Sequence, residues 1–316
     1  MRKVSEHSED DMADSTPAEK TTAVVHEITE AIGGRVTVEK ILPARCGITA
    51  KVDVNGRAAL LKYVDANERN RFAAHRVHGI HNEVDILTLL GRDVVASPRE
   101  QADTAWLIQP WIDDNNAWHH TAFVRRHPVG TDDRAHFLTE ATRISAALEN
   151  LHRHSVLHGD LQPRHVIVGD DESTHLIDFD VSVRTDNDSP QYVGGLVHHV
   201  APEVATGMLR NDKPIPINPR TEVFALGSVL FQLYTGTVPH WYGTDPTVDD
   251  FATTDRDRKC RAVVEGRRRT FAHIGAPPFD DFADILNTCL AYRPADRFGT
   301  VADVTAALHA TIITAR

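Results

Sequence analysis

The chain has 316 residues, of which 41% are hydrophobic and 25% are charged, and its formal net charge is −11. This length and composition predict a globular protein with one large domain or two lobes, and the acidic balance disfavours nucleic acid as a partner. The sequence has no run of eighteen apolar residues and its N-terminal stretch is polar, so we expect no membrane insertion, no signal peptide and a cytoplasmic location.

The first part of the chain predicts a small lobe built on an antiparallel sheet. Residues 1–20 are rich in polar and acidic side chains, which is typical of a disordered tail. After one helix, hydrophobic alternation over residues 35–64 predicts three strands, two of them joined by the hairpin signal Asn55-Gly56. One main helix and the buried strand AWLIQPWI follow. We assign residues 21–112 to this N-terminal lobe.

Residues 113–316 predict a larger, mainly helical lobe. In AHFLTEATRISAALENLHRH, apolar residues recur at steps of three and four, as on one face of a helix. TEVFALGSVLFQLYTG is apolar on nearly all sides, which predicts a buried helix. The order of elements is therefore that of an α+β protein, with a small sheet lobe followed by a helical lobe.

The residues that carry chemistry suit phosphoryl transfer. That reaction needs a cation near the phosphates, carboxylates that hold a metal, and a carboxylate that orients the attacking hydroxyl. Lys62 lies at the end of a predicted strand, and Glu83 lies on the next helix, placed to pair with it. Asp160 and Asp178 lie in two loops joined by the apolar strand HVIV.

Five motifs, in order, make residues 35–310 resemble the eukaryotic-type protein kinase superfamily. HGDLQPRHV resembles the catalytic loop H-R-D-L-K-P-x-N, and DFD resembles D-F-G. HHVAPEV contains A-P-E, TEVFALGSVLFQLYTGTVP resembles the buried helix under the catalytic loop, and RPADRF supplies Arg297 to pair with Glu203. The resemblance implies a bilobal protein-kinase-like fold, ATP with Mg²⁺ (or Mn²⁺) as cofactors, and a protein substrate.

The resemblance also implies a role for each candidate residue. Asp160 orients the acceptor hydroxyl and takes its proton, while Lys62, fixed by Glu83, neutralises the α- and β-phosphates. Asp178 holds the metal, with His165 at the place of the family's asparagine. Further nucleotide contacts are expected from Gly47 in the phosphate loop, from the main-chain carbonyl of Gln109 and from the main-chain amide of Trp111.

The chain departs from the family pattern around these residues. Only Gly47 survives in the phosphate-covering loop, LPARCG, where Arg45 is a candidate to supply charge instead. Gly159 replaces the arginine that would tie the loop to a phosphorylated activation segment, so we expect activity not to depend on such phosphorylation. Gln162 and Leu196 replace the lysine and the threonine that contact the acceptor, which argues against the usual Ser/Thr handling.

Three functions therefore stay open. The first is an ATP-dependent kinase that phosphorylates a hydroxyl, most simply Ser or Thr of a protein. The second is a pseudokinase that acts as a nucleotide-binding or protein-interaction module, favoured by the eroded phosphate loop and by His165. The third is a small-molecule kinase of the aminoglycoside-phosphotransferase type, favoured by H-G-D and opposed by A-P-E. A histidine metal centre is not expected, because adjacent histidines such as His119 and His120 point apart.

Overall fold

The computed structural model describes residues 17–44, 47–67, 73–99, 103–112, 115–125, 130–169, 171, 173–186, 192, 195–248, 250, 252–277 and 279–314. Arg45 and residues 1–16 of the expected tail lie outside these ranges. The chain packs into two compact units, one running to Val84 and including Gly91–Trp111, the other formed by Asp85–Leu90 and the chain from Ile112 onward.

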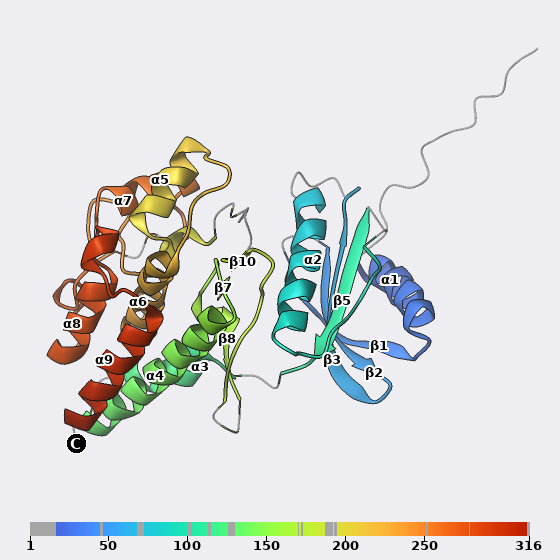
Figure 1. Ribbon diagram of the computed structural model, residues 1–316, viewed down its shortest axis with the longest axis horizontal. Coiled ribbons are helices and arrows are strands. Elements are labelled where there is room, and N and C mark those ends of the chain that lie inside the picture. The colour runs from blue at the N-terminus through green and yellow to red at the C-terminus, as the bar shows by residue number, and fades with distance from the viewer. Residues whose placement is uncertain are drawn as a thin grey trace, which may run out of the picture. The chain divides into compact units, whose positions relative to one another are not determined.

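The first unit is an antiparallel five-stranded sheet with strand order β1-β2-β3-β5-β4 and a helix on each face (Figure 1). Its elements are α1 (Pro17–Ile32), β1 (Val36–Leu42), β2 (Ile48–Val54), β3 (Arg57–Asp65), α2 (Ala73–Leu89, which belongs to the second unit from Asp85 onward), β4 (Val95–Ala96) and β5 (Thr104–Pro110). The predicted Asn55-Gly56 hairpin is confirmed, since Val54 pairs with Arg57 on either side of it. Helix α1 begins at Pro17, so the last four residues of the expected tail are helical.

The two faces of this sheet are covered separately because side chains alternate along each strand. On β5, Trp106 joins the core formed with α1, which includes Ile28 and Leu61. Its neighbour Leu107 joins the opposite core, which includes Ile80 of α2. Strand β3, in the middle of the sheet, is therefore held between two apolar layers, and its side chains have fixed positions.

The second unit is mainly helical and contains short strands around its loops. In the labels that follow, η marks a short 3₁₀ helix. Its described elements are β6 (Asn115–Asn116), α3 (Ala117–His120), η1 (Thr121–Arg125), α4 (Thr131–Arg153), β7 (Val156–Leu157), η2 (Pro163–His165), β8 (Val166–Val168), β9 (Thr174–Leu176), β10 (Val183–Arg184), η3 (Val197–His199), α5 (Pro202–Arg210), α6 (Pro219–Thr235), α7 (Arg256–Val264), η4 (Ala272–Ile274), α8 (Asp280–Cys289), η5 (Pro294–Asp296) and α9 (Val301–Thr314). These two units confirm the α+β class.

Helix α6 forms the centre of the helical unit. Its side chains are buried on nearly all sides, as its sequence predicts. The helix begins after Asn218, whose side chain accepts from the amides of Arg220 and Thr221, and it ends at Gly236 in the left-handed conformation. Helices α4 and α8 both pack against it. No helix within the described ranges is long and apolar enough to cross a membrane.

Candidate active site

The sheet unit brings together the two charged side chains that the sequence paired. Lys62 on β3 donates from Nζ to both carboxylate oxygens of Glu83 on α2, at 2.9 and 2.7 Å. The Glu83 side chain is fully buried, whereas 16% of the Lys62 side chain is exposed. A carboxylate buried to this degree needs a cationic partner. The predicted Lys62–Glu83 ion pair is confirmed, and it fixes the ammonium group on the sheet.

Gln109 adds a contact to this ion pair. It lies on β5 opposite Leu60 of β3, and its side-chain Nε2 donates to Glu83 Oε1 at 3.5 Å. Gln109 is itself buried, so its amide group supports the position of the glutamate. The contact of its main-chain carbonyl with adenine stays a prediction.

Two other backbone positions that were expected to contact the nucleotide, Trp111 and Gly47, make close contacts within the sheet unit. The amide of Trp111 donates to the carbonyl of Ala58 at 3.0 Å, because strand pairing continues past Pro110. This corrects the expectation that the Trp111 amide faces adenine. Gly47 has a φ of +70°, and a Cβ at this position would lie 2.0 Å from the carbonyl oxygen of Tyr63. The close approach to Tyr63 therefore already requires glycine at residue 47, and its contact with phosphate stays a prediction.

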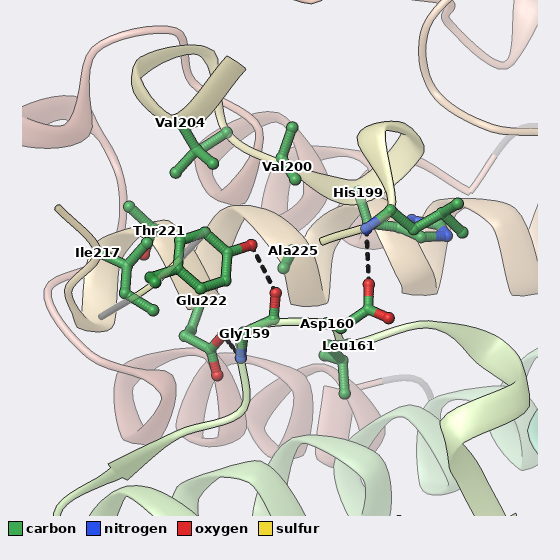
Figure 2. Close-up of a pocket in the computed structure, with 13 residues that line it drawn as sticks. Gly159, Asp160, Leu161, His199, Val200, Val204, Ile217, Thr221, Glu222 and Ala225 are labelled. Atoms are coloured by element: carbon green, nitrogen blue, oxygen red, sulfur yellow. Dashed lines mark hydrogen bonds between the residues drawn. The ribbon is translucent and has the colours of Figure 1, made fainter. Parts of the chain in front are cut away.

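In the helical unit, the loop that carries Asp160 is anchored by Glu222 of α6. The two carboxylate oxygens of Glu222 accept from the amide of His158 at 2.8 Å and from the amide of Gly159 at 3.0 Å, the latter drawn in Figure 2. Burial raises the pKa of Glu222, but the hydrogen bond and charge of His152, together with His158 and the Gly159 amide, outweigh it and hold this pKa below its ordinary value. An ionised carboxylate from the helical core thus positions the loop.

His158 links this loop to the one that contains Asp178. Its Nε2 lies 3.1 Å from the carbonyl of Ile177 and donates to it, since a carbonyl oxygen only accepts. The side chain is fully buried, and this burial lowers its pKa despite the opposing charge of Glu222. His158 therefore connects the two loops as a neutral side chain.

The Asp160 carboxylate is oriented by two donors from the same chain. Its Oδ1 accepts from the amide of Leu196 at 2.6 Å, and its Oδ2 accepts from Nε2 of Gln162 at 3.0 Å. About a fifth of the side chain, 19%, is exposed. Gln162 and Leu196 are two positions at which the sequence departs from the kinase pattern, and both contact the predicted catalytic aspartate. A carboxylate can accept about four hydrogen bonds, so Asp160 retains acceptor capacity.

His165 lies between the two aspartates that the sequence singled out. Its Nδ1 is 3.0 Å from the main-chain carbonyl of Asp160, so Nδ1 carries a proton. Its Nε2 is 3.0 Å from Oδ2 of Asp178. Two acceptors do not approach this closely with nothing between them, so the contact needs either a proton shared by Nε2 and the carboxylate or a cation bound by both atoms. Burial lowers the pKa of His165, but the hydrogen bond to Asp178 and the charges of Asp178 and Asp160 raise it above its ordinary value.

A close contact explains why glycine replaces the expected arginine before Asp160. Gly159 has a φ of +78°, and a Cβ there would lie 2.7 Å from the carbonyl oxygen of Val181 and 3.0 Å from the Tyr192 ring. The hydroxyl of Tyr192 donates to the carbonyl of Gly159 at 2.7 Å. Gly195 packs against the same loop, since its Cβ would lie 2.7 Å from Oδ1 of Asp160. Tyr192 therefore occupies space that a side chain at residue 159 would need.

A small pocket adjoins the Asp160 loop within the helical unit (Figure 2). Its lining is largely apolar, and the carboxylate-bearing residues Asp160 and Glu222 are part of it. The other lining residues are Gly159, Leu161, Tyr192, Leu196, His199, Val200, Ala201, Val204, Ile217, Thr221 and Ala225.

The predicted pair of Glu203 and Arg297 is also confirmed. Nη1 and Nη2 of Arg297 donate to the two carboxylate oxygens of Glu203, at 2.7 and 2.9 Å. The three remaining N–H groups of Arg297 donate to the carbonyls of Ala291, Arg220 and Tyr292. All five donors of this buried guanidinium are thus used, which is a structural role and not a catalytic one.

Comparison with known proteins agrees with this geometry. The model of the protein kinase domain matches residues 50–310. The chain belongs to this family. A probable serine/threonine-protein kinase of Clostridium acetobutylicum is 33% identical over 104 residues, which are 32% of this chain and 15% of that protein. PknB of Lactococcus lactis, described as a probable serine/threonine-protein kinase, is 28% identical over 115 residues, 35% of this chain and 17% of its own.

The serine/threonine-protein kinase PknH of Mycobacterium tuberculosis is 24% identical over 171 residues, 53% of this chain and 24% of its own. The match thus spans a quarter or less of the length of each of these kinases.

Sequence reasoning missed two residues that shape the site of this protein kinase domain. Glu222, which anchors the loop amides, is the one charged residue among the buried positions of α6, and that contrast was the available signal. Tyr192, which packs on Gly159 and hydrogen-bonds to it, carries no such signal. Its contact depends on how a segment more than thirty residues away in the sequence folds back onto the loop.

Proposed function

We propose that this protein kinase domain transfers the γ-phosphoryl group of ATP to a hydroxyl, most simply Ser or Thr of a protein substrate. The observation that carries the proposal is the contact of Lys62 with both oxygens of Glu83. In protein kinases this ion pair must be in place for phosphoryl transfer. Asp160 would orient the hydroxyl and accept its proton, and Lys62 would neutralise the α- and β-phosphates. The kinase relatives named above support this assignment.

The donor set around Asp178 suits a divalent cation. Two ligands placed at right angles on a metal, each at about 2.1 Å, lie about 3.0 Å apart. The separation of His165 Nε2 and Asp178 Oδ2 is 3.0 Å, and the protonated Nδ1 leaves the Nε2 lone pair for a metal when the ring is neutral. When bound with ATP, the metal would neutralise charge on the phosphates. We therefore assign Asp178 and His165 as candidate ligands of Mg²⁺ or Mn²⁺.

Two observations favour a second candidate function, that of a pseudokinase. Both oxygens of Asp160 already accept hydrogen bonds from the chain itself, from Leu196 and Gln162. In addition, a protonated His165 would occupy the Asp178 oxygen that a metal needs. A chain held in that state would serve as a nucleotide-binding or protein-interaction module without catalysis.

Incubating the purified chain with γ-labelled ATP and Mg²⁺ or Mn²⁺ separates these functions. Label on a generic protein substrate or on the chain itself would support the kinase, provided that Lys62→Met abolishes it. Label only on small hydroxyl compounds would instead identify a small-molecule kinase. Nucleotide binding without transfer in either metal would contradict the kinase proposal and support the pseudokinase.

The metal preference tests the position of His165. We expect the wild type to turn over faster with Mn²⁺ than with Mg²⁺, because Mg²⁺ prefers oxygen ligands and an imidazole nitrogen suits transition metals better. His165→Asn restores an oxygen ligand and should raise the ratio of Mg²⁺ to Mn²⁺ activity. Steady-state rates for both metals in both proteins measure this ratio. An unchanged ratio would show that residue 165 does not contact the metal.

A further inference from the structure

A second cluster of metal-ligating side chains lies in the helical unit, apart from the residues assigned above. His120 ends α3, and His136 and Glu140 lie one turn apart on α4. Residues four apart on a helix point to the same side. One ligating atom from each of the three residues lies within 4.8 Å of the others. From the sequence we weighed His120 only together with its neighbour His119. In the structure, the ligating groups near His120 are those of His136 and Glu140 on α4.

Glu140 is the unusual member of this cluster. The residue is 1% exposed, although a carboxylate is costly to bury unless its charge is compensated. Arg143 donates from Nη1 to Oε1 at 2.6 Å. The other oxygen, Oε2, faces Nε2 of His120 at 3.3 Å. Within the described ranges neither of these two buried atoms has a hydrogen-bond partner. One carboxylate oxygen and one imidazole nitrogen thus face the same point without a donor between them.

The separation of His120 Nε2 and Glu140 Oε2 matches that of two ligands around a tetrahedral cation. With bonds of about 2.0–2.1 Å to Zn²⁺, two tetrahedral ligands lie about 3.3 Å apart. His120 Nε2 lies 3.3 Å from one oxygen of Glu140, and His136 Nε2 lies 3.6 Å from the other. The Phe123 ring packs on the His136 ring, with centroids 4.6 Å apart, and supports its orientation. Arg143 binds Oε1, the oxygen that faces His136, so Oε2 is the oxygen left for a cation. One ligating atom of His136 still lies within 4.8 Å of the other two ligands.

We propose that His120, His136 and Glu140 form a binding site for a zinc-class divalent cation. Two imidazoles and one carboxylate are a ligand set that Zn²⁺ accepts, with the fourth position left to water. The cluster borders solvent at His136, since 56% of that side chain is exposed. The cation would join the end of α3 to α4. This site does not depend on phosphoryl transfer.

The test is a titration of the full chain, stripped of metal, with ZnCl₂ in the absence of nucleotide. It is run in an Asp178→Asn background, so that Asp178 and His165 do not account for the binding. We expect one Zn²⁺ per chain by calorimetry, and tetrahedral visible absorption bands when Co²⁺ replaces Zn²⁺. His136→Ala should weaken Zn²⁺ binding by more than about tenfold, since it removes one of three protein ligands.

The control variant is His119→Ala, which removes an exposed histidine next to His120 that is not part of the cluster. It should bind Zn²⁺ like the parent, and Zn²⁺ should raise its melting temperature but not that of His136→Ala. Because His136 is exposed, its removal should leave the fold intact, which circular dichroism checks. Absence of stoichiometric binding, or equal affinity in the two variants, would overturn the proposal and leave His120–Glu140 as an ion pair of a protonated histidine.

Discussion

Replacing Asp160 with asparagine is expected to lower phosphoryl transfer by about 10² to 10⁴ with little change in ATP affinity, because a positioned carboxylate that takes the hydroxyl proton contributes about that factor. The fold should tolerate the change. The asparagine carbonyl can still accept from the amide of Leu196, and the side-chain amide of Gln162 can turn to present its oxygen to the new NH₂ group. Single-turnover rates and nucleotide titrations, both expressed per folded molecule, measure the two effects separately.

Asp178→Asn is the matched comparison for this result. It removes a candidate metal ligand in place of a proton acceptor, so we expect weaker binding of metal–ATP as well as slower transfer. If Asp160 only stabilises the loop, Asp160→Asn would lower the melting temperature and reduce activity only in proportion to the lost folded protein. Full turnover per folded molecule in Asp160→Asn would rule out the mechanism proposed here.

The largest effect on stability is expected from Arg297→Ala. Breaking a buried ion pair at one partner costs about 3–5 kcal/mol, which corresponds to a fall of roughly 5–8 °C in melting temperature for a chain of this size. The loss includes three carbonyls, of Ala291, Arg220 and Tyr292, that would lose their donor. Thermal unfolding followed by circular dichroism measures the shift.

Arg153→Ala is the control for this prediction. Arg153 also pairs with a glutamate, Glu149, but 65% of its side chain is exposed. Exposed ion pairs of this kind contribute about 0–1 kcal/mol, so its melting temperature should stay close to that of the wild type. Similar shifts in the two variants would mean that burial of Arg297 does not set the strength of its contacts.

The sequence predicted best those features that depend on nearby residues or on strong periodicity. The Asn55-Gly56 hairpin and the buried helix α6 follow from turn chemistry and from an apolar run. The Lys62–Glu83 pair could be predicted because a lysine on a predicted strand precedes a helix with a single glutamate. The pairing of Glu203 with Arg297, 94 residues apart, came only from the family resemblance.

What the sequence did not reveal depends on where the backbone runs. The amide of Trp111 is engaged because strand pairing extends beyond Pro110, and no residue type signals where a ladder stops. Strands β7 and β10 are two residues long, too short to show a period. The His120–Glu140 contact joins separate helices, so spacing along the chain could not indicate it.

The hydrogen bonds from the amides of His158 and Gly159 to Glu222 have a consequence for how this protein can be regulated. Glu222 is buried in α6, the helix against which α4, α8 and α9 pack. Freeing either amide would leave an ionised carboxylate short of donors inside the core, which costs on the order of 1–3 kcal/mol or more. A movement of the backbone just before Asp160 therefore carries this cost. A movement of the Leu196 or Gln162 groups that contact the Asp160 side chain leaves both hydrogen bonds to Glu222 in place.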